Sequence, residues 1–161
     1  MSVGLGTREL RALAERLARD RESWAPLVRH DPDERIFERI LDLPDVEGWL
    51  ICWMPGHDTG FHDHDESSGA VTVLSGGVCE ERLRLGAHGM LETFYSAGET
   101  FDFSPSDIHR VTHAGREPTV TLHVYSPRIA RPGAYSIDAR GVLRRYPVPS
   151  SQELRPLESA A

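Results

Sequence analysis

The hydrophobic and polar positions of the chain change their period near residue 35. Before that point, apolar residues recur at helical spacing, which predicts an amphipathic helix starting near Thr7 and a shorter one that is broken near Pro26. Between Arg35 and Tyr125 the apolar residues fall instead in short runs rich in β-branched and aromatic side chains. The pattern therefore predicts a helical start followed by a β-rich body.

The β-rich part is expected to consist of short strands separated by turn signals such as Pro55-Gly56 and Ser75-Gly76-Gly77. The expected strands span Gly48–Met54, Ala70–Leu74, Val78–Leu85, Leu91–Tyr95, Thr100–Phe103, Arg110–His113 and Thr119–Tyr125, and a hairpin-like piece follows around Tyr135–Tyr146. Many short strands at regular spacing favour a barrel or a sandwich.

These elements predict an all-β fold with a short α-helical segment in front of it. We expect residues 1–34 to form a helical segment packed on the barrel and residues 35–146 to form the barrel itself. Residues 147–161 are rich in Pro, Ser and Glu and are expected to form a flexible tail. A length of 161 residues suits one domain with a substantial core.

Composition narrows the classes of partner. The formal net charge of -7 argues against nucleic acid or an anionic membrane surface as the main partner. No apolar run approaches the roughly 20 residues of a membrane span, and the first residues lack a signal-peptide core. Two cysteines are too few for a secreted disulfide scaffold. We therefore expect a cytoplasmic protein.

Candidate metal chemistry is concentrated in the motif His62-Asp63-His64. On a strand, residues two apart project to the same face, so both imidazoles could share one cation. His109, from a strand far along the chain, could supply the third nitrogen. Three neutral imidazoles with open coordination positions describe a catalytic metal centre rather than a structural one.

Other interpretations of these residues stay open. Ordinary histidines near turns would produce the same pattern. Glu66 falls in the same alternation as His64 and could add a carboxylate if the strand continues, although Glu66-Ser67-Ser68-Gly69 is typical of a turn. His123 and Tyr125 also share a strand face, and their alternative is a half-buried strand with polar pairs toward solvent.

On these residues the chain resembles the cysteine dioxygenase family, which are thiol dioxygenases of the cupin superfamily. The segments that carry the resemblance are Leu50-Ile51-Cys52-Trp53, Gly56-His57, His62-Asp63-His64, Ile108-His109-Arg110-Val111 and Leu122-His123-Val124-Tyr125-Ser126-Pro127. They occur in family order, with near-family spacing, over about residues 35–146. The resemblance implies a small cupin β-barrel of the jelly-roll type.

The resemblance also implies a site and a reaction. Fe(II) would be held by His62, His64 and His109, and the enzyme would convert L-cysteine and O₂ to cysteine sulfinic acid. His123 would orient the Tyr125 hydroxyl toward the iron-bound ligands. The partners would be a small-molecule thiol and O₂, with no nucleic acid or membrane, and the protein would be a monomer.

Two positions depart from the family pattern near that site. Thr121 stands where the family commonly has Ser, which keeps a hydroxyl on a stiffer side chain. Gly69 stands where animal members carry the cysteine that is cross-linked to the tyrosine, so no thioether cross-link is expected. Ser126-Pro127 matches a Ser-Pro that is cis in the family.

The resemblance implies that the choice of thiol substrate depends on an arginine. In the family's cysteine-specific branch, an Arg in the neighbourhood of Arg39 pairs with the substrate carboxylate, and Phe37 stands where that branch has Tyr. The alignment could shift to Arg35. A guanidinium presents a fork of donors that suits a carboxylate. Branches that act on 3-mercaptopropionate tend to have Gln there, so Arg39 favours cysteine.

Two further functions remain open from the sequence. One is the same chemistry on another thiol, such as 3-mercaptopropionate. The other is a non-catalytic metal-binding cupin that senses a small molecule. The segment 122–127 argues against a sensor, because a sensor has no evident need for a tyrosine over the metal.

Overall fold

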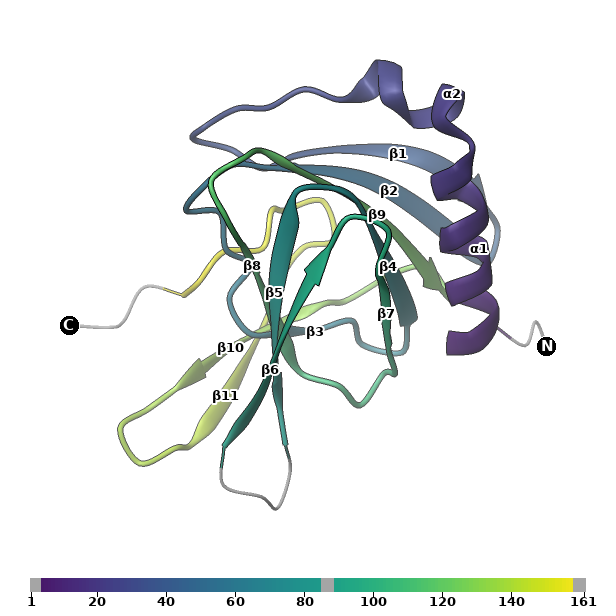
Figure 1. Cartoon of the computed structure of the whole chain (residues 1–161). Coiled ribbons are helices and arrows are strands. Elements are labelled where there is room, and N and C mark those ends of the chain that lie inside the picture. Colours follow the sequence, from purple (N-terminus) through teal and green to yellow (C-terminus); the bar gives the residue numbers. More distant parts are fainter. Residues whose placement is uncertain (1–3, 85–88, 158–161) are drawn as a thin grey trace.

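The computed structural model describes residues 4–84 and 89–157. In this part of the chain two antiparallel β-sheets face each other, and the helix α1 (Thr7–Arg19) packs across the outer side of one of them (Figure 1). A short helix, α2 (Arg21–Trp24), and a 3₁₀ turn, η1 (Ala25–Leu27), follow α1. None of the described helices is long and apolar enough to cross a membrane.

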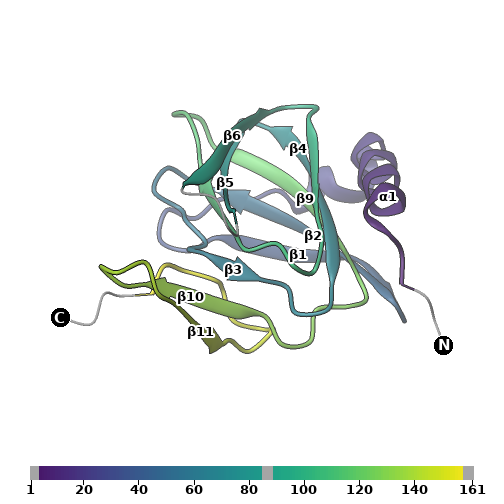
Figure 2. The same cartoon turned by 90° about the horizontal axis from the view of Figure 1, so that it is seen from below.

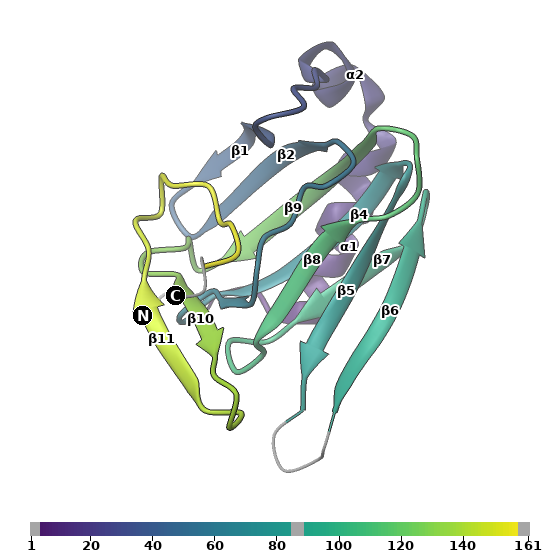
Figure 3. The ribbon, with the colours of Figure 1, turned by 90° about the vertical axis from the view of Figure 1, so that its left-hand side faces the viewer.

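The first sheet has the strand order β1-β2-β9-β4-β7, and the second has the order β11-β10-β3-β8-β5-β6. The strands of the first sheet are β1 (Ile36–Leu43), β2 (Val46–Trp53), β4 (Ser68–Ser75), β7 (Thr100–Phe103) and β9 (Thr119–Ser126). Those of the second are β3 (His62–Asp63), β5 (Gly77–Leu83), β6 (Met90–Ser96), β8 (His109–His113), β10 (Gly133–Ile137) and β11 (Leu143–Pro147). Seen from the side, β8, β5 and β6 form a layer in front of β9 and β4 (Figure 3).

Strand β9 lies in the middle of the first sheet and is buried on both faces. Val120, Leu122 and Val124 join a core with Leu10 and Ala14 of α1, which lies outside this sheet (Figure 2). The alternate residues of β9 are polar and face the space between the sheets. The two-residue period of a strand therefore separates an apolar face, which holds the helix, from a polar face, which can carry chemistry.

The space between the two sheets is partly filled by a second apolar core. Its buried residues are Trp53, Val71, Val73, Val78, Phe101, Phe103, Val111 and Tyr125. Burying each large side chain of this kind stabilises the fold by about 1.5–3 kcal/mol. This core fixes the strands against which the polar site is built.

The prediction of an all-β fold with a short N-terminal helix is confirmed, and the Ser126–Pro127 bond is cis. Strand β1 was not among the expected strands. Its ladder with β2 shifts register between Arg39 and Leu41, so its apolar positions do not keep a regular period of two. Strand β3 has only two residues, His62–Asp63, so His64 lies just beyond it rather than on a long strand.

Candidate metal centre

Three histidines from neighbouring strands meet between the sheets. His62 of β3 pairs directly with His109 of β8, and His64 follows β3. The ring centroids lie 4.7 Å apart for His62 and His109 and 4.8 Å apart for His62 and His64. One ring nitrogen from each of the three lies within 4.8 Å of the others. The predicted ligands are therefore brought together closely enough to share one ion.

Hydrogen bonds on the far side of two rings determine which nitrogen is left for a metal. Nδ1 of His62 lies 2.9 Å from the carbonyl oxygen of Gly60, and Nδ1 of His109 lies 2.6 Å from Oε2 of Glu80. A neutral imidazole that donates from Nδ1 keeps its lone pair on Nε2. Nδ1 of His64 has no hydrogen-bond partner among the described residues. This donor set fits a first-row divalent metal such as iron.

Burial keeps these imidazoles neutral. Desolvation lowers the pKa of His62 to about 4, and it lowers the pKa values of His64 and His109 well below the ordinary value. At neutral pH each ring therefore keeps the lone pair that metal coordination requires.

The metal-free protein is expected to lose stability as the pH falls from about 6.5 toward about 4. Burial lowers the pKa of His62 to about 4 and that of His123 to about 3 in the folded state. Between these values and the ordinary pKa, the unfolded chain binds protons at these histidines and the folded chain does not, so acid favours unfolding. In this window each such histidine lowers the free energy of unfolding by up to about 1.4 kcal/mol for each unit that the pH falls. Above the window the histidine is neutral in both states, so it adds no pH dependence. Denaturant titrations across this range test the slope.

The control for that titration is the His123→Asn variant, whose stability should change less steeply because one titrating group is gone. A free energy of unfolding of the wild-type protein that stays constant between about pH 4.5 and 6.5 would contradict the assignment of these histidines as buried and neutral.

A row of hydrogen-bonded side chains along β9 leads toward the three clustered histidines. Nε1 of Trp53 donates to Oγ1 of Thr121 at 2.8 Å, and Oγ1 of Thr121 lies 2.7 Å from Nε2 of His123. Nδ1 of His123 lies 3.0 Å from the hydroxyl of Tyr125. The ring of Tyr125 stacks on that of His64 at a centroid distance of 5.3 Å. The predicted residues Thr121, His123 and Tyr125 thus form one connected row beside the histidines.

The first hydrogen bond of this row has a fixed direction. An indole N–H can only donate, so the Thr121 oxygen accepts from Trp53, and its own hydrogen is available for Nε2 of His123. When Thr121 donates to Nε2, His123 carries its proton on Nδ1 and donates to the Tyr125 oxygen. In that arrangement the hydroxyl hydrogen of Tyr125 is available to another acceptor. Burial raises the pKa of Tyr125 further above its ordinary value, so the hydroxyl stays protonated.

His62, His64 and His109 line a cavity of about 360 Å³ on the inner face of the first sheet. The cavity is lined by alternate residues of β1, β2 and β9, among them Phe37, Arg39, Glu47, Trp49, Ile51, Trp53, His123 and Tyr125. Cavities of about 300–1,000 Å³ are typical of small-molecule sites. The cavity is therefore large enough for a small molecule to reach the three histidines.

The two candidate arginines lie at different depths in this cavity. The side chain of Arg39 is 40 % exposed, lies over the ring of Trp49 and hydrogen-bonds to Asp42 at 3.3 Å. Arg35 is 6 % exposed and lies over the ring of Trp53. Both line the cavity, so the structure brings both arginines to it, Arg39 at the exposed side and Arg35 in the interior.

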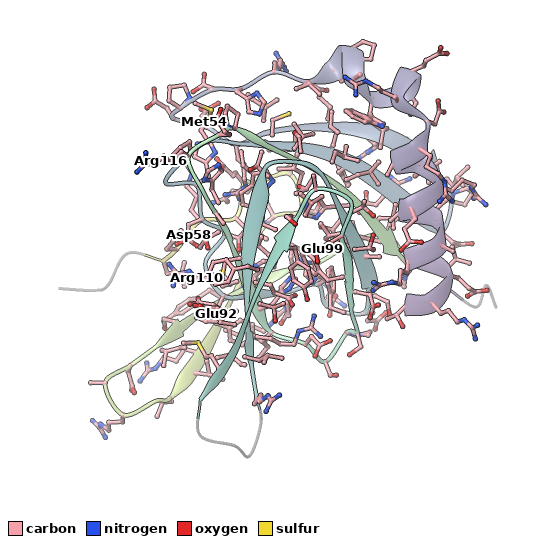
Figure 4. The ribbon with its side chains drawn as sticks, in the orientation of Figure 1. Met54, Asp58, Glu92, Glu99, Arg110 and Arg116 are labelled. Atoms are coloured by element: carbon pink, nitrogen blue, oxygen red, sulfur yellow. The ribbon has the colours of Figure 1, made fainter. Side chains whose placement is uncertain are left out.

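Residues near the C-terminus form one wall of the cavity. Ser150, Ser151, Gln152, Glu153 and Leu154 line it. The backbone N–H of Arg35 donates to Oε1 of Glu153 at 3.0 Å, and its guanidinium donates to the carbonyl oxygens of Asp58 and Leu154. Asp58 is itself held by Arg110, with Nε 2.9 Å from Oδ1 (Figure 4). Within the stretch whose composition predicts a flexible tail, Glu153 and Leu154 thus form hydrogen bonds with Arg35, which lies far away in sequence.

Two acidic residues that are close to the histidines in sequence, Asp63 and the candidate ligand Glu66, have other surroundings. The carboxylate of Asp63 accepts hydrogen bonds from the Tyr135 hydroxyl and from Arg145, and Glu66 is exposed in a turn. Among residues 4–84 and 89–157, the His/Cys/Asp/Glu group that could hold a metal consists of three histidines. The alternative of a carboxylate ligand from Glu66 does not match this geometry.

Glu80 is a further functional candidate that was not predicted from the sequence. It is 3 % exposed, lies behind His109 and is paired with Arg82. Burial raises the pKa of Glu80, and the hydrogen bond and charge of Arg82 oppose that rise. The available signal was alternation: Val78 is an inward apolar residue of β5, so Glu80 is an acid at an inward position of a strand, where charges are rare unless paired.

Comparison with known proteins shows which family the chain belongs to. The family model described as cysteine dioxygenase type I matches residues 5–138, which is most of the chain. The chain belongs to the cysteine dioxygenase family. Curated relatives include cysteine dioxygenase type 1 of Danio rerio, 25% identical over 137 residues, covering 78% of this chain and 68% of that protein. For Rattus norvegicus the identity is 25% over 129 residues, covering 74% of this chain and 64% of that protein.

The alignments thus span about two thirds of the length of these cysteine dioxygenase relatives. Solved structures support the fold. A Klebsiella pneumoniae protein with a double-stranded β-helix domain matches with a TM-score of 0.56 and 24% identity over 64% of this chain and 80% of that one. A cupin superfamily protein from Desulfitobacterium hafniense matches with a TM-score of 0.53 and 12% identity over 65% and 87%. The prediction of a cupin barrel is confirmed.

In this cysteine dioxygenase family member, Gly69 lies directly across from Tyr125 in the β4–β9 ladder. A Cβ placed on Gly69 would lie 2.3 Å from Cζ of Phe103 and 3.0 Å from Cδ1 of Tyr125. The Phe103 ring, stacked 4.4 Å from that of His64, therefore occupies the space beside the tyrosine where a larger residue would project.

The Gly69→Ala variant is expected to lower the free energy of unfolding by about 1–3 kcal/mol, because the added methyl group displaces the Phe103 ring. Chemical denaturation measures the loss. The same substitution should cost less in a Phe103→Leu background, where the space is larger. An equal cost in both backgrounds would show that Phe103 is not the obstacle.

Proposed function

We propose that this protein is a thiol dioxygenase that uses Fe(II), held by His62, His64 and His109, to convert L-cysteine and O₂ to cysteine sulfinic acid. The observation that carries the proposal is the set of three buried, neutral imidazoles beside a protonated Tyr125 in a cavity that contains arginines. Membership of the cysteine dioxygenase family supports it. The reaction balances without a further reductant, because both atoms of O₂ pass to the thiol sulfur.

The metal and the protein side chains would have different roles in the reaction. When bound, Fe(II) supplies the redox chemistry and a positive charge that favours the thiolate form of the substrate. Tyr125 supplies a hydroxyl hydrogen that can be donated to oxygen beside the metal, and His123 holds that hydroxyl in place. The buried rings of Trp53 and Phe103 shield the site from water. The protein therefore contributes positioning and hydrogen bonding.

A cationic side chain in the cavity would bind the substrate carboxylate. Arg39 hydrogen-bonds to one carboxylate oxygen of Asp42 at the exposed side of the cavity, which leaves most of its donors for a ligand. Arg35 already donates to two backbone carbonyl groups and lies 3.5 Å from Glu153. We propose Arg39 as the carboxylate contact, with Arg35 holding the wall formed by the C-terminal residues.

The Arg39→Ala variant is expected to raise KM for L-cysteine by about tenfold or more while changing kcat less, since a charge-assisted hydrogen bond contributes about 1.5–3 kcal/mol. Cysteamine, which lacks the carboxylate, serves as the matched substrate, and its KM should not change. Steady-state oxygen consumption measures both values. An unchanged KM for L-cysteine would remove Arg39 from the site and direct attention to Arg35.

The reaction itself is tested by isotope labelling. The iron-loaded protein is incubated with L-cysteine under ¹⁸O₂, and the product is analysed by mass spectrometry. The proposal predicts cysteine sulfinic acid that carries two labelled oxygen atoms. Cystine, or a product that carries oxygen from water, would contradict it.

The same chemistry on another thiol acid, such as 3-mercaptopropionate, is the second candidate. It is favoured by Phe37, which is 40% exposed at the cavity and has no polar group to fix the amine that L-cysteine carries and 3-mercaptopropionate lacks. The ratio of kcat/KM for L-cysteine to that for 3-mercaptopropionate separates the two.

We further propose that the protein acts as a monomer in the cytoplasm, with a thiol and O₂ as its partners. The net charge of -7 supports the absence of nucleic acid and of an anionic membrane surface among them. Light scattering of the purified protein measures the mass, which for a monomer is 18.0 kDa.

A further inference from the structure

The three metal histidines differ in what lies behind them. Nδ1 of His62 faces the neutral carbonyl oxygen of Gly60, and Nδ1 of His64 has no partner among the described residues. Nδ1 of His109 alone faces a carboxylate, that of Glu80, at 2.6 Å, and both side chains are 4 % exposed or less. The three histidines therefore differ in the partner of Nδ1, and only His109 has a carboxylate there.

Glu80 is itself held in a closed ring of contacts. Nη2 of Arg82 lies 2.9 and 3.0 Å from the two oxygens of Glu80, and the same guanidinium lies 3.4 Å from Oδ2 of Asp107. Asp107 accepts a hydrogen bond from the backbone N–H of Ser104 at 2.7 Å, which shapes the turn that leads into His109. The ring thus joins the backbone just before His109 to the side chain of His109.

The pairing of the strands adds to this ring. Arg82 of β5 lies directly opposite His109 of β8 in the ladder, and Glu80 lies opposite Val111. Side chains opposite each other on paired strands point to the same face, so Glu80 and Arg82 share a face with His109. The carboxylate behind His109 is therefore placed by regular strand pairing.

We propose that Glu80, held by Arg82, is the positioning residue of the metal site. It would accept the proton of Nδ1 of His109 in a hydrogen bond, fix that tautomer and ring orientation, and so direct the Nε2 lone pair at the metal. The carboxylate would also make His109 the strongest of the three donors, because a charged partner raises the basicity of a ligating imidazole more than a carbonyl group does. This assignment rests on the proposed metal-dependent function.

The test compares Glu80→Gln with Glu81→Gln in metal binding. Glutamine keeps the size of the side chain and one acceptor oxygen but removes the charge. Glu81 is the neighbouring acid of β5 and lies 3.5 Å from Arg110, away from the histidines, so its variant is the matched control. Affinities for Zn²⁺ and Co²⁺ are measured by competition with a chelator, and the visible spectrum of bound Co²⁺ reports the ligand field.

The expected result is an affinity about 10–100-fold weaker for Glu80→Gln, with an altered Co²⁺ spectrum, and wild-type behaviour for Glu81→Gln. The thermal unfolding midpoints of the metal-free variants separate this effect from a loss of folding. Wild-type affinity and an unaltered spectrum in Glu80→Gln would overturn the assignment while leaving the proposed function intact. A wild-type protein that binds no metal would overturn both.

A second measurement needs no substitution. In the zinc-loaded wild-type protein, long-range ¹H–¹⁵N NMR is expected to show His109 with its proton on Nδ1 and in a strong hydrogen bond. A proton on Nε2, or a ring that exchanges between the two tautomers, would overturn the assignment even if the Glu80 variants did not fold.

Discussion

The His109→Ala variant is expected to lose metal binding and thiol-dependent oxygen consumption together. Removing this imidazole leaves only His62 and His64 to hold the ion, and it removes one of the two hydrogen-bond partners of the buried Glu80 carboxylate, so that Arg82 remains. Turnover should fall below about a thousandth of the wild-type value, because the redox chemistry depends on the metal. Metal analysis of the purified variant and an oxygen electrode measure the two losses.

The matched control is His113→Ala. His113 ends the same strand, β8, and its Nε2 lies 2.7 Å from the carbonyl oxygen of Glu117, outside the residues that line the cavity. This variant should keep its metal and its turnover. A His109→Ala protein that binds one equivalent of metal and turns over normally would show that the three-histidine site is misassigned.

Replacing Tyr125 by phenylalanine should preserve the metal and lower kcat. The ring that stacks on His64 stays, but the hydroxyl that His123 supports is lost. Removing one preorganised donor from an oxygen-stabilising site costs about 10²–10³ in kcat. Steady-state kinetics with metal-loaded protein, normalised to metal content, measure the change.

Tyr95→Phe is the control for that substitution, since Tyr95 packs on Phe101 between β6 and β7 and does not line the cavity. It should leave kcat unchanged. Unaltered turnover in Tyr125→Phe would exclude the hydroxyl from the reaction. Loss of metal in that variant would instead indicate that Tyr125 is needed to build the metal site.

The features of the candidate site that follow from the local sequence pattern were predictable. The spacing of His62 and His64 and the alternation of Thr121, His123 and Tyr125 determine which side chains share a face. The structure places these residues as the spacing predicts, although β3 is much shorter than the strand assumed. His109 was found through the motif that surrounds it, since no rule of periodicity joins it to a histidine 47 positions earlier.

The features of the fold and of the site that depend on residues far apart in sequence were not predicted. Strand β1 was missed because its register shift interrupts the two-residue period. The wall near the C-terminus depends on Glu153 meeting the backbone of Arg35, which is 118 residues away. The alternation of β5 marks Glu80 as an inward acid, but its neighbours Glu81 and Arg82 make its charge look like part of a solvated face, and its contact with His109 follows only from the pairing of β5 with β8.

Oxygen consumption by the Fe(II)-loaded protein is the most direct test of the proposed function. The protein is challenged with L-cysteine, 3-mercaptopropionate, cysteamine and a larger thiol acid, and the products are identified. The account predicts oxygen uptake that depends on both iron and thiol, fastest with L-cysteine, with a sulfinic acid as product. No uptake with any of these thiols, in protein shown to contain iron, would contradict it.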